Sequence, residues 1–164
     1  MTEEIKFYND TLKRRIGFDE LIKEISKYVN EKPKSDYLIT VGTDSAGVND
    51  TELVTAITIL RVGNGGKYFW TKSEKIFCPT LHDRIYKEAM QSITFTQELK
   101  SRLKDKLGEE YLWDNKITVH LDIGKNGPTR DFIDSVIGMV KGFGLEAAIK
   151  PYSYCASIVA DRHT

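Results

Sequence analysis

The segment from Ile117 to Gly124 constrains the fold most, because apolar and polar residues alternate along it. Its odd-numbered positions are all Ile, Val or Leu, whereas its even-numbered positions include His120 and Asp122. This period of two predicts a strand with one buried face and one polar face. Asp122 would then end a strand that precedes a loop and a helix, which is where open α/β sheets bind ligands. An acid on a half-exposed strand is the other interpretation of the same pattern.

The rest of the chain divides into alternating helices and strands. Apolar spacing predicts helices at 18–30, 80–107, 129–142 and 154–162, and strands at 37–42, 53–62, 67–77, 117–123 and 145–149. Short loops join the first three strands, as in an antiparallel meander, and a helix precedes each later strand, which predicts parallel pairing. We therefore expect an α/β fold with a mixed five-stranded sheet, three antiparallel strands followed by two parallel additions, flanked by helices. The first 17 residues are predicted to form a loosely held arm.

Length and composition limit the classes of protein to consider. A chain of 164 residues suits one domain, which we expect to span 1–164. Lys+Arg and Asp+Glu are both 24, so no net basic charge announces a nucleic-acid partner. The two cysteines form no metal motif and no disulfide framework, and we see no signal peptide or long apolar run. The expected setting is the cytoplasm, without membrane insertion.

Asp44 is the candidate site residue of the first strand. It lies within Gly42–Ser45 (GTDS), at the end of the apolar run that starts at Tyr37. Counting back by two gives Gly42 and Thr40, so Asp44 shares their face, and Gly42 leaves space beside it. The alternative interpretation is a turn at Asp44–Gly47, in which the Asp side chain bonds nearby backbone amides.

Glu88 is the candidate acid of the long helix. It lies seven residues after Leu81 and three after Ile85, so it points with the apolar stripe of that helix. A carboxylate aimed at the core is costly unless it is paired or binds a cation. The alternative is a rim position with a salt bridge to Arg84 or Lys87. Two further acids share the helix and compete with Glu88 for the role, namely Asp83 and Glu98.

The C-terminal residues 160–164 (ADRHT) contain the last candidates, Asp161 and His163. A frayed, solvated terminus is the alternative. Four acids crowded together would repel one another, so the set Asp44, Glu88, Asp122 and Asp161 implies a bound cation. Carboxylate oxygens suit Mg²⁺ or Mn²⁺, and two such ions promote phosphodiester cleavage. His120 or His163 would move a proton or orient water, although each also suits a structural role.

Four motifs resemble the YkuK-like family of uncharacterised bacterial proteins, within the ribonuclease H-like superfamily. They are GTDS at 42–45, HLDIG at 120–124 with Asn126 and Gly127, KPYS at 150–153 and ADRHT at 160–164. The resemblance covers about 36–164 and leaves the arm and helix of 1–35 outside the common core. It implies a nuclease with two Mg²⁺ or Mn²⁺ ions. Asp44 and Asp122 match the strand-end ligands, with Asp44 bridging the ions; Glu88 matches the helix acid and Asp161 the last-helix acid.

Two functions follow as hypotheses. The first is a metal-dependent nuclease with catalytic residues Asp44, Glu88, Asp122, Asp161 and His163. The second is a catalytically inactive ribonuclease H-like module that binds nucleic acid or protein. A third interpretation takes 44–47 as the phosphate loop of sugar-kinase and actin relatives, but the chain lacks their second domain. The partner is DNA or RNA, and the aromatic strand 68–70 with the N-terminal helix offers a surface for a possible homodimer. A local groove would be lined by Lys125, Lys141, Lys150 and Arg162.

Overall fold

The computed structural model describes residues 5–47, 49–110, 117–153, 160 and 163–164. The long helix starts and ends where the sequence predicts: the Thr80 hydroxyl accepts a hydrogen bond from the Asp83 backbone N–H at 3.1 Å, and Gly108 ends the helix with a φ of 90°. The described helices and strands are, in chain order, α1 (Phe18–Glu31), β1 (Tyr37–Ser45), β2 (Asn49–Arg61), β3 (Gly66–Cys78), α2 (Leu81–Leu107), β4 (Ile117–His120), the 3₁₀ helix η1 (Arg130–Phe132), α4 (Ile133–Gly142) and β5 (Glu146–Ala148).

The five strands form one mixed sheet in the order β3-β2-β1-β4-β5. β1 pairs with β2 and β2 with β3 in antiparallel fashion, whereas β4 is parallel to both β1 and β5. The predicted arrangement of three antiparallel strands followed by two parallel additions is confirmed. Because β4 is parallel to its neighbour β1, the C-terminal ends of the two strands lie at the same end of the sheet.

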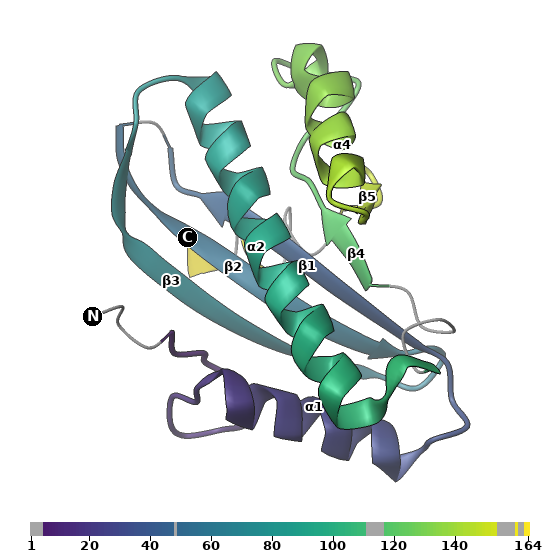
Figure 1. Ribbon diagram of the computed structural model, residues 1–164. Coiled ribbons are helices and arrows are strands. Elements are labelled where there is room, and N and C mark those ends of the chain that lie inside the picture. Colours follow the sequence, from purple (N-terminus) through teal and green to yellow (C-terminus); the bar gives the residue numbers. More distant parts are fainter. Residues whose placement is uncertain (1–4, 48, 111–116, 154–159, 161–162) are drawn as a thin grey trace.

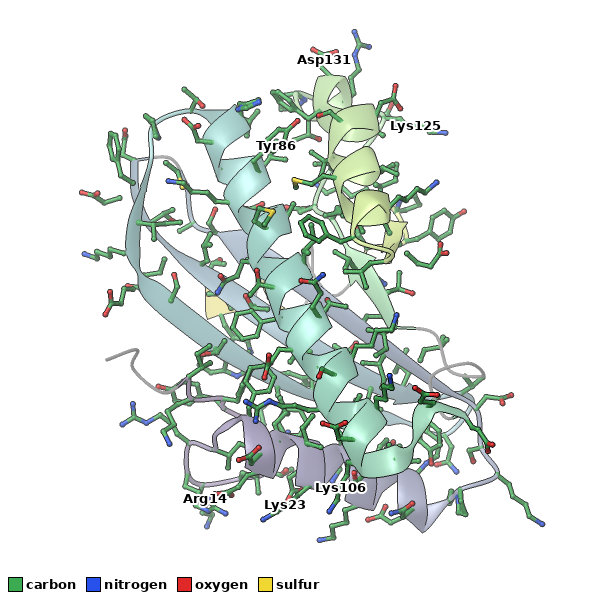
Figure 2. The ribbon with its side chains drawn as sticks, in the orientation of Figure 1. Arg14, Lys23, Tyr86, Lys106, Lys125 and Asp131 are labelled. Carbon is green, nitrogen blue, oxygen red and sulfur yellow. The ribbon has the colours of Figure 1, made fainter. Side chains whose placement is uncertain are left out.

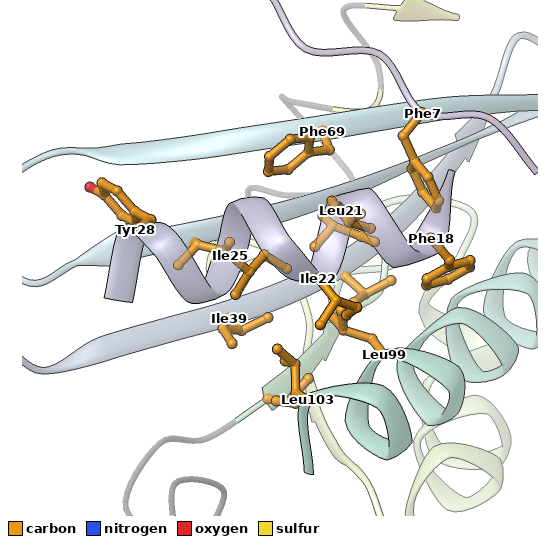
Figure 3. Packing of buried hydrophobic residues seen from close by; sticks show 14 of the residues in the cluster. Phe7, Phe18, Leu21, Ile22, Ile25, Tyr28, Ile39, Phe69, Leu99 and Leu103 are labelled. Atoms are coloured by element: carbon orange, nitrogen blue, oxygen red, sulfur yellow. The ribbon is translucent and has the colours of Figure 1, made fainter. Parts of the chain in front are cut away.

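One face of the sheet carries α1, α2 and α4. Figure 1 shows α2 crossing the sheet diagonally, with α1 near one end of it and α4 beside the other. Figure 3 shows the core where α1, α2 and the strands meet, which includes Leu21, Ile25, Ile39, Leu99 and Leu103, all fully buried. A second cluster joins α2 and α4 to β4 through Ile93, Val119 and Val140. None of the described helices is both long and apolar enough to cross a membrane.

The loosely held arm predicted for residues 1–17 is wrong for the described part of it. Phe7 and Ile16 are buried and exchange two backbone hydrogen bonds of 2.7 and 2.9 Å. Tyr8 exchanges two more with Trp70 of β3, at 2.8 and 3.0 Å. The segment therefore pairs with strand β3 and adds buried side chains to the core formed by α1 and α2. Its few apolar residues stand far apart among polar ones, so no periodicity revealed the packing.

The C-terminal half departs from its predicted boundaries. β4 ends at His120 instead of near Ile123, and β5 comprises only Glu146–Ala148. The alternating burial nevertheless continues, because Leu121 and Ile123 remain buried beside α2 and α4. Backbone bonds from Leu121 to Ala148 and from Lys150 to Ile123 hold this irregular part of the edge. The helix predicted for 129–142 opens with η1, and the helix predicted for 154–162 falls almost wholly outside the described residues.

Candidate functional site

The register between the parallel strands β1 and β4 positions the first two acids of the site. Gly42 of β1 lies opposite His120 of β4. Two residues farther along each chain come Asp44 and Asp122, and side chains two residues apart share a face of a strand. Asp44 is still within β1, whereas Asp122 follows the end of β4. The fold therefore brings these two acids to the same end and the same face of the sheet.

Glu88 joins them from α2. A hydrogen bond of 2.7 Å links the hydroxyls of Thr43 and Ser92, which fixes α2 over β1. One helical turn earlier, the Ser45 hydroxyl donates to Glu88 Oε1 at 2.7 Å. Glu88 is buried, with 6% of its surface exposed, so the predicted inward direction is confirmed. Three acids from β1, α2 and the segment after β4 thus gather at one end of the sheet.

Arg84 lies among these acids. Its Nε–H donates to Glu88 Oε1 at 3.1 Å, and its terminal nitrogen lies 3.7 Å from Asp44 Oδ1. Burial alone would lower the pKa of the Arg84 guanidinium, but the carboxylates of Glu88, Asp44 and Asp122 together raise it above the ordinary value. The salt bridge between Arg84 and Glu88 is thus confirmed, but the rim position that the alternative joined to it is wrong, because Glu88 is buried. Lys87 bonds the Phe77 carbonyl instead.

A second basic residue reaches the site from the segment after β5. Lys150 Nζ lies 3.0 Å from Asp122 Oδ1, and its side chain is about half exposed. Glu88 and Asp122 also line one small cavity under α2, together with Thr43, Ser92 and His120. In Figure 2, Lys125 projects from the end of the molecule that carries the loop after β4. Lys150, which is half exposed, therefore contacts the acid cluster from the solvent side.

Burial dominates the electrostatics of Glu88. It raises the pKa of this carboxyl above the ordinary value, and the charge of Asp122 acts in the same direction. The hydrogen bond from Ser45 and the charge of Arg84 oppose this rise. A buried acid with a raised pKa beside other acids is a common feature of functional sites, because bringing a cation close makes ionisation favourable.

The donor set suits a hard divalent cation in its chemistry, since Asp44, Glu88 and Asp122 offer only carboxylate oxygens. Among the residues that the structure describes, no three Asp, Glu, His or Cys side chains converge closely enough to hold a metal ion. Arg84 instead contacts the carboxylates of both Asp44 and Glu88. Asp161, the fourth predicted ligand, lies outside the described residues.

The competing helix acids lie elsewhere and have other partners. Asp83 belongs to the N-terminal cap of α2, where the Thr80 hydroxyl bonds its carboxylate at 2.8 Å. Glu98 is exposed and forms an ion pair of 2.6 Å with Arg102. Of the three acids considered on this helix, Glu88 is the one in contact with Ser45 and Arg84 beside Asp44.

Of the two candidate histidines, His163 contacts aromatic side chains and His120 is buried. His163 stacks on Trp70 of β3, with ring centroids 4.0 Å apart, and its catalytic role stays a prediction. Trp70 also stacks on Tyr8, so this part of the aromatic strand 68–70 makes contacts within the chain. Phe69 is buried, and the homodimer also stays a prediction. His120 is buried at the end of β4, and burial lowers its pKa to about 4.

The low pKa of His120 predicts that acid destabilises the fold. The pKa in the folded protein lies below the unfolded value of about 6.5, so the unfolded chain binds the proton first as the pH falls. The contribution of neutral His120 to the free energy of unfolding is full above about pH 6.5 and is lost as the pH falls towards 4. We expect a loss of about 2 kcal/mol between pH 7 and pH 5.

Urea unfolding of the wild-type protein and of H120Q over this pH range measures the effect. The variant lacks the titrating group, so its free energy of unfolding should fall by about 2 kcal/mol less between the two pH values. Equal pH dependence of the two proteins would contradict the assignment of the acid sensitivity to His120.

The sequence indicates Arg84 only as a local salt-bridge partner, and Lys150 only as part of a groove and of the KPYS motif. The spacing of Arg84 and Glu88, four residues apart on a helix, predicts their pairing. No local signal connects Arg84 with Asp44, because that contact depends on the position of α2 over β1. The contact between Lys150 and Asp122 depends in the same way on the parallel pairing of β4 with β5.

Comparison with known proteins agrees with this architecture. The family model described as ribonuclease H-like matches residues 20–164, which includes most of α1. A protein from Bacillus subtilis (strain 168), described as uncharacterized protein YkuK, is 30% identical over 177 residues, covering 100% of this chain and 99% of its own length. No solved structure gives a significant match. The chain therefore belongs to the ribonuclease H-like family, as the resemblance of its motifs predicts.

Proposed function

We propose that this protein is a metal-dependent nuclease that hydrolyses phosphodiester bonds. The observation that supports the proposal most is that three acids, two of them buried, lie at one end of the sheet, on β1, on α2 and in the segment after β4. Burying carboxylates together is unfavourable unless a cation compensates them. Membership of the ribonuclease H-like family supports the same conclusion, because nucleases of this superfamily use such carboxylates.

The residues proposed to hold Mg²⁺ or Mn²⁺ are Asp44, Glu88, Asp122 and Asp161. A bound divalent cation supplies Lewis acidity, which favours ionisation of an attacking water and stabilises charge on the leaving oxygen. The Ser45 hydroxyl orients Glu88 through their 2.7 Å bond. His163 is proposed to accept or deliver a proton during the reaction.

A catalytically inactive ribonuclease H-like module is the second candidate, and one observation favours it. Arg84 forms ion pairs with Asp44 and Glu88, and Lys150 forms one with Asp122. These two basic groups compensate most of the negative charge of the three acids without any metal, so the same cluster would also serve as a structural polar centre. Such a module would bind nucleic acid or protein without turnover.

The proposed partner is DNA or RNA, and the proposed location of the protein is the cytoplasm. Lys125 and Lys150 lie at the end of the sheet that carries the acids and supply positive charge for a phosphate backbone. The whole chain has no net charge, so we expect this attraction to be local and strongly dependent on salt. The homodimer proposed from the aromatic strand is a separate question of oligomeric state.

Metal binding and cleavage together test the proposed function. Labelled DNA, RNA and RNA–DNA hybrid are incubated with the purified protein in Mg²⁺ and in Mn²⁺, and thermal melting is followed with and without Mn²⁺. A metal that binds the folded state at about 100 times its dissociation constant adds about 2.7 kcal/mol, or roughly 5–10 °C at this chain length. Cleavage together with this shift supports the nuclease. Absence of both at millimolar metal favours the inactive module.

A further inference from the structure

The side chain of Arg84 contacts two of the three acids, Asp44 and Glu88, and its geometry is unusual for a purely structural ion pair. It contacts Glu88 through Nε alone, at 3.1 Å, and its terminal nitrogen remains 3.7 Å from Asp44. A strong arginine–carboxylate pair is bidentate, with two parallel bonds to one carboxylate. Here one guanidinium is shared between carboxylates of two different elements, so neither pair has the preferred geometry.

The exposure of the three side chains gives the direction of access. Asp44 and Glu88 expose only 4% and 7% of their side chains, whereas Arg84 exposes 25%. The guanidinium therefore lies between the buried carboxylates and the solvent. Because Arg84 is joined to α2 by a long flexible stem, the guanidinium can turn outwards without a change in the backbone.

The positive charges at the cluster are fewer than the negative ones. The carboxylates of Glu88, Asp44 and Asp122 all act on the Arg84 guanidinium, so one positive charge compensates up to three negative charges. Lys150 adds a second positive charge at Asp122. A divalent cation brings twice the charge of one guanidinium and binds carboxylate oxygens directly. It would repel Arg84 if both occupied the same place.

We propose that Arg84 is a resident counter-ion of the acid cluster, whose guanidinium competes with a divalent cation for the carboxylates of Asp44 and Glu88. The proposal rests on the proposed function, because it requires that the acids bind metal. In the metal-free protein Arg84 holds the acids together and stabilises the fold. When the cation binds, Arg84 leaves the carboxylates and turns towards the solvent, which sets the metal concentration at which the site fills.

Calorimetric titration with Mn²⁺ tests the competition on the whole chain. R84Q removes the competing charge and should bind Mn²⁺ about tenfold more tightly than the wild-type protein, while R84K should stay close to it. R102Q is the matched control, because Arg102 pairs with Glu98 on the same helix, also four residues away, but far from Asp44. R102Q should leave Mn²⁺ affinity unchanged. Circular dichroism establishes that each variant is folded.

The outcomes separate this inference from the proposed function. Tighter binding in R84Q alone supports the competition. Equal or weaker binding in R84Q, with clear binding in the wild-type protein, overturns the competition and leaves the metal site in place. If neither protein binds Mn²⁺ at millimolar concentration, the proposed metal-dependent function fails and the competition fails with it.

A second measurement covers the case in which R84Q does not fold. In wild-type protein labelled with ¹⁵N-arginine, the Arg84 Nε–H signal is assigned by its absence in R84K. Its hydrogen bond to Glu88 should be lost on titration with diamagnetic Mg²⁺, so the signal should move towards the position of a solvated arginine. A signal that stays in place while Mg²⁺ binds would overturn the inference.

Discussion

Changing Asp44 to Asn should lower the rate of metal-dependent phosphodiester cleavage by on the order of 100-fold or more. The substitution keeps the size of the side chain and one oxygen but removes the negative charge. Asp44 is buried, so no solvent-exposed acid can replace it at the end of β1. The same variant should lose the upward shift of the melting temperature that we expect Mn²⁺ to produce in the wild-type protein. Initial rates with the substrate that the wild-type protein cleaves, and melting curves, measure both effects.

The matched control is D36N. Asp36 is an exposed Asp just before β1, at the end of the strand opposite Asp44. Both variants lose one negative charge, and D36N should keep the cleavage rate and the response to Mn²⁺. E98Q adds a test of the helix acid, because Glu98 pairs with Arg102 and should not affect cleavage. Cleavage that persists unchanged in D44N would show that the activity comes from a contaminating nuclease.

The sequence predicted the acids at the site because their positions follow from short-range patterns. The alternation through Ile117–Ile123 placed Asp122 on the polar face after β4, and counting by two placed Asp44 on one face with Gly42. The helical stripe through Ile85 directed Glu88 inwards, and its burial confirms this. Periodicity carries such information because the repeat of a strand or helix is a local property of the backbone.

Contacts between elements could not be predicted in the same way. Arg84 reaches Asp44 only because hydroxyl contacts such as Thr43–Ser92 place α2 over β1, and this placement depends on the whole core. The backbone hydrogen bond from Leu121 to Ala148, just beyond the end of β4, likewise joins segments that are far apart in the sequence. A local pattern therefore identifies the face on which a residue lies, but not the residue that it meets there.

The N-terminal arm shows the same limit most clearly. Phe7 stands next to Tyr8 in an otherwise mostly polar segment, and no period marks it as buried. In the structure its ring lies edge-on to Phe18 of α1 at 4.9 Å and to Phe95 of α2 at 5.9 Å between centroids. It also belongs to the cluster that includes Phe69 of β3. One side chain therefore joins the arm to α1 and to the distant helix α2, within a cluster that also includes β3.

Changing Phe7 to Ala should lower the free energy of unfolding by about 3–4 kcal/mol, because the ring is fully buried and the cavity cannot collapse between two rigid helices. At this chain length the melting temperature should fall by roughly 10 °C. I5A is the matched control in the same arm: the Ile5 residue is 42% exposed, and its loss should cost less than about 1 kcal/mol. Urea unfolding of both variants measures the difference. Equal, small effects would show that the arm does not contribute to the core, and the α1–α2 packing would then have to carry the stability of this end of the sheet without it.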